Sequence, residues 1–321
     1  MVGHDSTVST AENYRRFGRQ EAAGRSPAYE RLALGVSTDR LVLTFLRRLP
    51  PAKRQPNLLF AAARRLLGSP PDLDSLRALI AGRGGELRSL MLARSTQTNE
   101  PARCASLLPA LGLLPEPLAL LEVGAAAGLT LLPDAYSYDF GGHRIAGADP
   151  EGPILRCRPI GPVPLPGRTP EVVWRAGIDL NPLNVGDADD LDWLRCLIWP
   201  GEADRDRRLQ TAAATARRHP PQVHRGDLLT DLSRVAALAP PEATLVVYHS
   251  AVLAYVPEQK RREFGAAVCA LGAVWLSNEA PGVLPDLAVG PPGGAGFIVA
   301  EGGTRVLART DPHGTWLEWL A

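Results

Sequence analysis

The chain has 321 residues, of which 45% are hydrophobic and 21% charged, so it can bury one large core or two modest ones, and wholesale disorder is excluded. Its 31 glycines and 30 prolines follow no collagen-like period, which indicates many loops rather than a fibre. The four cysteines are widely spaced, with no Cys-x-x-Cys pair and no histidine at metal-ligand spacing. We therefore expect neither a disulfide framework nor a metal site.

The net charge of +1 is unevenly spread, because residues 1–100 hold 16 Lys and Arg against 9 Asp and Glu. The arginines there alternate with apolar residues, as on the solvated faces of amphipathic helices, so we expect no specific nucleic-acid binding. The polar N-terminus has no signal-peptide pattern, and no apolar run approaches the ~18 residues of a membrane span. The sequence thus predicts a cytoplasmic protein outside the membrane and leaves the oligomeric state open.

The first third of the chain has helical periodicity. After a flexible tail at residues 1–10, apolar side chains recur at steps of three and four residues. Asp72 or Asp74 is expected to cap one of these helices at its N-terminus. We predict a mainly helical region over residues 11–115.

Short apolar runs typical of buried strands alternate with helical stretches in residues 116–321. The expected parallel strands cover residues 118–123, 171–176, 244–248 and 273–277, and the expected helices cover 188–199, 205–218, 228–238 and 258–271. Short runs at residues 297–300, 304–310 and 315–320 predict an antiparallel edge. The sequence therefore predicts an α/β domain with a doubly wound, mostly parallel sheet, in which residues 133–170 form an insertion or lid.

The sharpest local feature is a glycine turn after the first expected strand. It carries Glu122, Gly124, Ala126 and Gly128 in the pattern E-x-G-x-x-x-G, and the helix expected to follow would offer free N–H groups to a ligand. A dinucleotide-binding turn would have a glycine in place of Ala126. The pattern instead resembles the first motif of class I S-adenosylmethionine-dependent methyltransferases, which implies that Glu122 lies near the amino group of the cofactor. A plain strand-to-helix turn is the alternative.

Two later acidic residues fit the cofactor site of such a fold. Asp179 ends the next strand, where an acid can bind ribose hydroxyls, although the insertion places it farther from Gly124 than is usual. Asp227 follows a third strand and either lies beside the adenine or caps the next helix.

Five segments occur in an order that resembles a known family. They are Gln97–Glu100, Leu121–Leu129, Gly177–Pro182, Val247–Ser250 and Asp311–Trp316. Together they resemble the DUF2332 family, a group of bacterial, largely actinobacterial, proteins of unknown function. The resemblance implies a methyltransferase-like Rossmann fold and carries over no catalytic residue.

Polar residues next to the expected strands are the candidates for chemistry. His249 is a candidate general base, because imidazole titrates near neutrality, or a hydrogen-bonded strand-end residue. Glu100 is the second candidate catalytic residue, and a favourable charge at a helix start is its alternative. Candidate substrate-binding residues are Gln97, Asn99, Tyr138, Tyr248, Ser250, Asn278 and Glu279. We expect the strand ends to converge at one sheet edge, roofed by residues 97–100 and 136–139.

These features favour an S-adenosylmethionine-dependent methyltransferase that acts on a small molecule, in which catalysis is mostly positioning of the reacting groups. The alternative is a non-catalytic nucleotide- or metabolite-binding protein on a methyltransferase-like fold, serving as a sensor or assembly partner. A nucleic-acid methyltransferase that uses the arginine-rich N-terminal region is a third, weaker interpretation.

Overall fold

The computed structural model describes residues 9–284, 286–287 and 296–321 and divides into two compact units. The α/β unit contains Asn99–Gly186 and Arg208–Ala321. The helical unit contains the described residues 9–98 together with Asp187–Arg207. The segment 187–207 thus belongs to the helical unit, although in the sequence it lies between two strands of the α/β unit.

The helical unit follows the predicted periodicity. Its elements are α1 (Thr10–Arg16), the π-helix η1 (Phe17–Ala22), α2 (Pro27–Val36), α3 (Arg40–Arg47), the 3₁₀ turn η2 (Pro51–Lys53), α4 (Pro56–Leu67), α5 (Leu73–Ala93) and α7 (Ala188–Cys196), and α8 (Ala203–Arg218) begins in it. Asp72 caps α5, since its carboxylate accepts from the Ser75 N–H at 2.8 Å while the Ser75 hydroxyl bonds back to the Asp72 N–H. Of the two expected caps, Asp72 is the one used.

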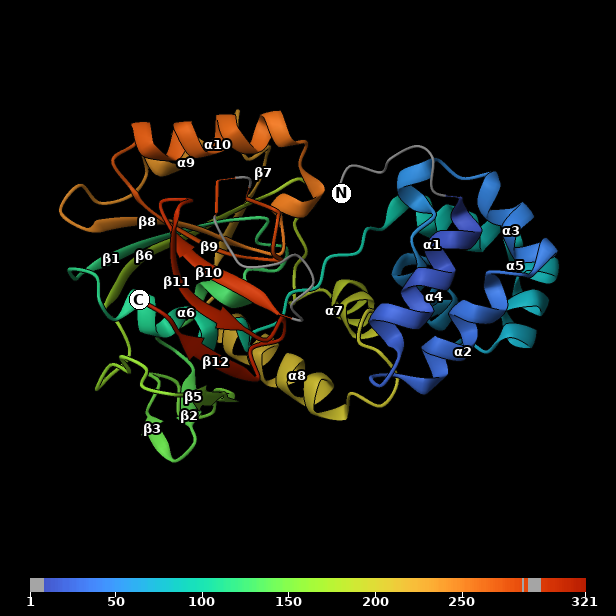
Figure 1. Cartoon of the computed structure of the whole chain (residues 1–321), viewed down its shortest axis with the longest axis horizontal. Coiled ribbons are helices and arrows are strands. Elements are labelled where there is room, and N and C mark those ends of the chain that lie inside the picture. The colour runs from blue at the N-terminus through green and yellow to red at the C-terminus, as the bar shows by residue number, and fades with distance from the viewer. Residues whose placement is uncertain (1–8, 285, 288–295) are drawn as a thin grey trace. The chain divides into compact units, whose positions relative to one another are not determined.

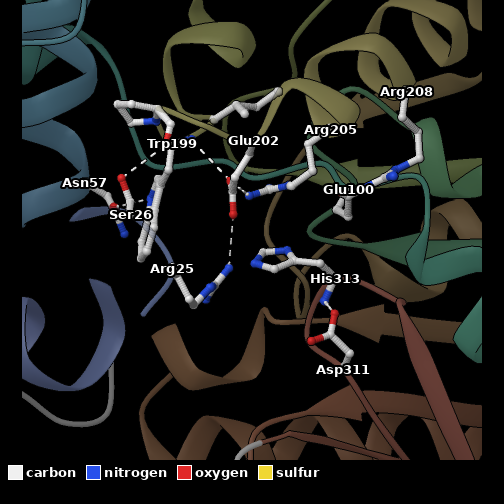
Figure 2. A network of polar contacts seen from close by, with 12 residues as sticks. Arg25, Ser26, Asn57, Glu100, Trp199, Glu202, Arg205, Arg208, Asp311 and His313 are labelled. Atoms are coloured by element: carbon white, nitrogen blue, oxygen red, sulfur yellow. Dashed lines mark hydrogen bonds and ion pairs between the residues drawn. The ribbon is translucent and has the colours of Figure 1, made fainter. Parts of the chain in front are cut away.

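Aromatic rings pack at the centre of the helical unit. The Phe60 ring lies 4.9 Å from Tyr29 and 5.9 Å from Phe17, between ring centroids. Trp199 comes from the segment 187–207, and its ring lies 5.3 Å from Phe17. Figure 2 shows the Trp199 indole N–H donating to Asn57 Oδ1, at 2.9 Å. The core of this unit therefore depends on residues from both of its chain segments.

A nine-stranded sheet forms the centre of the α/β unit, in the order β5-β12-β11-β10-β9-β8-β1-β6-β7 (Figure 1). Its strands are β1 (Leu118–Val123), β5 (Arg158–Ile160), β6 (Val172–Asp179), β7 (Gln222–Arg225), β8 (Thr244–Ser250), β9 (Val274–Glu279), β10 (Phe297–Glu301), β11 (Arg305–Thr310) and β12 (Trp316–Trp319). Strands β7, β6, β1, β8 and β9 are parallel, β10 to β12 are antiparallel to their neighbours, and β5 is parallel to β12. The predicted mostly parallel sheet with an antiparallel C-terminal edge is confirmed.

One face of this sheet is covered by α9 (Leu232–Ala236) and α10 (Glu258–Ala270), and α6 (Arg103–Leu111) lies on the other side (Figure 1). Side chains from β1, β8 and β9 pack with the two helices into an apolar core that includes Val123, Val247, Phe264, Val268 and Trp275. Alternate residues of each strand face this core, so the residues between them face the α6 side.

Two local expectations are wrong. No α-helix follows the glycine turn: the chain forms only the 3₁₀ turn η3 (Leu129–Leu131). Pro133 explains this, because a proline four residues after Leu129 cannot donate to its carbonyl and disfavours helical backbone before it. The helix expected over residues 228–238 is reduced to α9, since residues 228–231 form a turn.

The insertion over residues 133–170 has secondary structure of its own. Strands β2 (Ser137–Phe140), β3 (His143–Ile145) and β4 (Ile154–Arg156) form a small sheet in the order β3-β2-β4. Strand β5 then leaves this sheet and joins the edge of the large one beside β12. The segment is thus a folded subdomain rather than a structureless connection.

Candidate functional site

The predicted convergence of strand ends is present. Glu122 of β1 is in register with Tyr248 of β8, and Ser250 of β8 is in register with Asn278 of β9. Strand β1 lies between β6 and β8. Strands β6 and β7 follow one another on one side of β1, and the later strands β8 and β9 follow one another on its other side. Open α/β sheets bind ligands at the carboxyl edge beside such a reversal of strand order. This edge is the candidate functional site.

The candidate residues at this edge are divided between the two faces of the sheet. His249 bonds to Trp275 of the α10-side core, and Glu279 bonds to His249. Tyr248 points the other way, because its hydroxyl donates to the Thr130 carbonyl of η3. Sequence neighbours therefore lie on opposite sides, as the two-residue period of a strand requires. The expected single pocket that contains all of them is wrong.

Glu122 is the most unusual charged residue on the α6 side. Its side chain is 3% exposed, and the Thr130 hydroxyl donates to its Oε1. Among the described residues, its Oε2 has no hydrogen-bond partner. Burial raises the pKa of Glu122 to about 8, and the hydrogen bond from Thr130 and the charge of Arg103 only partly oppose that shift. The carboxyl group is thus mostly protonated at neutral pH, with one oxygen unused by the protein.

Arg103 is a central residue that the sequence-based prediction missed. Its guanidinium donates to the Ser250 carbonyl at 3.1 Å and to the Pro312 carbonyl at 2.9 Å. It also lies over the Phe297 ring, 5.8 Å from the centroid. Arg103 therefore connects the end of β8 with the turn between β11 and β12 and brings a positive charge close to Glu122.

The first half of the glycine turn is bonded to β6. Gly124 has a φ of +71°, and its N–H donates to the Ile178 carbonyl at 2.7 Å. The Ala125 N–H donates to the same carbonyl at 3.3 Å. Ala126 also has a left-handed φ, of +51°, and its N–H donates to the Asp179 carboxylate at 2.8 Å. These three donors are directed at the neighbouring strand.

N–H groups in the second half of the turn also donate hydrogen bonds within the protein. The Gly128 N–H donates to the Ala125 carbonyl at 2.7 Å, and the Leu129 N–H donates to Asn99 Oδ1 at 2.8 Å. Phosphate-binding turns present free N–H groups at the start of a helix. Here five N–H groups between residues 124 and 129 are used within the protein, and the helix is absent. The expected presentation of free N–H groups by this turn is therefore wrong.

The two expected cofactor acids have contacts within the protein. Besides the Ala126 N–H, the Asp179 carboxylate accepts the Asn181 N–H at 2.7 Å, so it links the glycine turn to the end of β6. The Asp227 carboxylate accepts the N–H groups of Leu229 at 2.9 Å and Thr230 at 3.4 Å. Asp227 thus stabilises the turn before α9, whose N-cap residue is Asp231, so the expected helix cap is wrong and a place for Asp227 beside the adenine stays a prediction. Ribose binding by Asp179 stays a prediction.

His249 is fully buried, and both ring nitrogens are bonded. The Trp275 indole N–H, which can only donate, lies 3.0 Å from Nε2, so Nε2 accepts. Nδ1 therefore carries the proton and donates to Glu279 Oε1 at 2.8 Å. Glu279 Oε1 also accepts the N–H groups of Val252 and Leu253. No lone pair of His249 is left to remove a proton from a substrate, so the geometry argues against a general base and for the hydrogen-bonded alternative.

The remaining strand-end residues form a buried amide and hydroxyl network. The Asn278 side-chain NH₂ donates to Ser250 Oγ at 3.1 Å, and Asn278 Oδ1 accepts the Thr310 hydroxyl at 3.1 Å. Asn278 and Thr310 are both 0% exposed. This network fastens the end of β8 to β9 and to the antiparallel part of the sheet, and Thr310 was not anticipated.

The segment 97–100 lies across the division between the two units. Gln97 belongs to the helical unit, whereas Asn99 and Glu100 belong to the α/β unit. Glu100 is 3% exposed and forms an ion pair with Arg208 of α8, 2.7 Å between Oε1 and Nε (Figure 2). Its Oε1 also accepts the Ala102 N–H at 3.2 Å. Asn99 instead supports η3, as described above.

The aromatic residues of the insertion do not close over the edge of the sheet. Tyr138 is 1% exposed, and its hydroxyl donates to the Pro133 carbonyl at 2.5 Å. Tyr136 is 0% exposed and donates to the Leu129 carbonyl at 2.7 Å. Both rings are buried inside the fold, and Tyr136 holds the insertion against η3. The expected roof of exposed aromatic residues is therefore wrong.

The described residues contain neither a cluster of metal ligands nor a membrane-spanning helix. No three His, Cys, Asp or Glu side chains gather there closely enough to hold a metal ion. Over the same part of the chain, every helix is too short or too polar to cross a bilayer.

A family model described as uncharacterized proteins conserved in bacteria, DUF2332, matches residues 11–319. The chain belongs to the DUF2332 family. No curated protein matches it, and no solved structure does. In this DUF2332 protein the candidate functional residues lie at the carboxyl edge of the parallel strands.

Proposed function

We propose that this DUF2332 protein binds S-adenosylmethionine at the carboxyl edge of β1 and transfers its methyl group to a small molecule. The observation that carries the proposal is the position of Glu122, a buried carboxyl with an unused oxygen, at the strand where the order reverses. The parallel strands have the order third, second, first, fourth, fifth along the chain, which is the order of doubly wound nucleotide-binding sheets.

The glycine turn favours a nucleoside ligand without phosphate. Binding of a pyrophosphate needs several free N–H groups, whereas those of Gly124, Ala126 and Gly128 all donate within the protein. S-adenosylmethionine carries no phosphate, so it needs no such donors from the turn. The same contacts make a dinucleotide such as NAD a poor ligand for this turn.

Glu122 provides the polar recognition in this proposal. S-adenosylmethionine has an ammonium and a sulfonium group, and either cation would favour the ionised form of Glu122 by direct attraction. The nearby charge of Arg103 opposes a second cation, so the ligand cation must lie on the Oε2 side of the carboxylate. Binding is then coupled to loss of a proton from Glu122.

Titration calorimetry tests the proposal with S-adenosylmethionine, S-adenosylhomocysteine and NAD as ligands. We expect the two adenosyl compounds to bind and NAD not to bind, with Glu122→Gln weakening the adenosyl compounds by roughly 10- to 100-fold because one charge-assisted contact is lost. Glu171→Gln is the matched control, since Glu171 is exposed and precedes β6 at the opposite end of the sheet. No binding of either adenosyl compound, or equal effects of the two variants, would contradict the proposal.

A second candidate is a binding protein on the same fold, without catalysis. The specific observation in its favour is His249, whose two nitrogens are both bonded inside the core, which leaves this edge without the expected general base. The two candidates differ in turnover: release of S-adenosylhomocysteine in the presence of mixed small-molecule acceptors supports the transferase. Tight binding without release supports the binding protein.

A further inference from the structure

The glycine turn is covered by a side chain of the protein, that of Val252. A Cβ atom placed on Gly124 would be 2.3 Å from Val252 Cγ2 and 2.7 Å from Val252 Cγ1. The two valine methyl groups therefore touch the bare face of the glycine. A ligand cannot reach that face of Gly124 while Val252 is in this position, because no atom fits between them.

Val252 is held there by polar contacts from β9. Glu279 Oε1 accepts the Val252 N–H at 2.8 Å and the Leu253 N–H at 2.9 Å. The preceding residue, Ala251, has a φ of +59°, and its N–H donates to the Asn278 carbonyl at 3.0 Å. A left-handed alanine persists only where its surroundings impose it.

The Glu279 carboxylate is in turn held by His249. Nδ1 of His249 donates to the same Oε1 at 2.8 Å, and the Trp275 indole fixes the other side of the imidazole ring. One carboxylate oxygen thus receives three donors, two of which are the backbone N–H groups on either side of the Val252 Cα atom. Glu279 and His249 act on the glycine turn only through this backbone.

We propose that Val252 is the gate of the ligand site at the glycine turn and that Glu279 is the positioning residue that keeps the gate closed. The inference rests on the proposed adenosyl site and adds that the ligand reaches Gly124 only after Val252 has moved. The His249–Glu279 pair, which lies on the other face of the sheet, then regulates ligand access rather than proton transfer. When only a fraction of molecules is open, the apparent dissociation constant rises by the inverse of that fraction.

Affinity for S-adenosylhomocysteine tests the gate in the full chain. We expect Val252→Ala to bind about tenfold more tightly than the unmodified protein, and Val252→Ile to bind more weakly, because a smaller or larger side chain frees or blocks the face of Gly124. Val256→Ala is the matched control: Val256 is another half-buried valine, four residues later, and it packs against the apolar core beneath α10. Equal affinities of Val252→Ala and Val256→Ala would overturn the gate and leave the proposed ligand in place.

Hydrogen exchange separates gating from a purely structural role. The N–H groups of Val252 and Leu253 lose their acceptor when the gate opens, so S-adenosylhomocysteine should accelerate their exchange, and slower exchange would overturn the inference. Glu279→Gln, which keeps an oxygen acceptor, should retain the closed segment, whereas Glu279→Ala should bind more tightly. If only Val252→Ala binds the ligand, the gate is supported and the transferase proposal for the unmodified protein fails. If no variant binds it, both fail.

Discussion

Replacing Glu122 by glutamine should change how the stability of the protein depends on pH. Burial moves the pKa of this carboxyl from 4.5 to about 8 in the folded chain. Between these pH values the folded state holds a proton that the unfolded state has released, so the free energy of unfolding falls as pH rises, by about 1.4 kcal/mol per unit. The stabilisation is fully present below pH 4.5 and is lost as pH rises towards 8. From pH 4.5 to neutrality this amounts to about 3 kcal/mol.

Urea unfolding across the range from pH 4.5 to 8 measures this contribution. Glu122→Gln carries no titrating proton at this position, so its stability relative to the unmodified protein should increase steadily with pH. Thr130→Val is the control, because it removes the hydroxyl that donates to Glu122 but keeps the buried carboxyl. Loss of that hydrogen bond should raise the pKa of Glu122 further, so the free energy of unfolding should continue to fall up to a higher pH. Parallel pH profiles for Glu122→Gln and the unmodified protein would refute the reasoning, since they would mean that Glu122 ionises equally in both states.

Three further substitutions test contacts of the edge by denaturant unfolding. Gly124→Ala should lower the free energy of unfolding by about 2 kcal/mol or more, because it adds a methyl group at a left-handed φ. Adding Val252→Ala to the same chain should recover part of this loss. If the effects of the two substitutions were strictly additive, the contact between Gly124 and Val252 would be contradicted. His249→Ala should cost about 2–4 kcal/mol, since it leaves the Trp275 N–H unpaired next to a cavity, and a loss within measurement error would reject the buried hydrogen bonds. Asp179→Ala should cost about 1–3 kcal/mol through two lost backbone contacts, and an unchanged stability would instead favour ribose binding as its role.

The sheet was predictable because buried parallel strands are recorded in short apolar runs. Strand β1 has the predicted bounds, 118–123, since every residue in it is buried and the sequence is apolar apart from Glu122. The strand-glycine pattern predicts a helix after the glycine turn, but Pro133, four residues after the first residue of η3, prevents one from forming. The proline that prevents this helix is visible in the sequence, and its local effect on the backbone is stronger than the preference of the fold for a helix at this place.

The site was only partly predictable, and the reason is geometric. Chain direction places Tyr248, His249 and Ser250 at the correct edge, but neighbouring residues of a strand face opposite sides. The side of the sheet on which each residue lies depends on where Trp275 and Thr130 pack, which is tertiary information. Arg103 was missed for a related reason: its partners are carbonyl groups, which any residue provides, so no spacing in the sequence records them.

The divided chain of the helical unit has a consequence for protein synthesis. Arg94 pairs with Asp190 at 2.5 Å, and the Trp193 indole donates to the Ser95 carbonyl at 3.0 Å. Trp199 likewise joins the aromatic core from the second segment. The first 98 residues therefore leave the ribosome without the partners that complete their core, and those partners emerge only after β1 and β6 have been made. Folding in simple N-to-C order is impossible for this unit, and truncation near residue 98 should yield an exposed, aggregation-prone helical fragment.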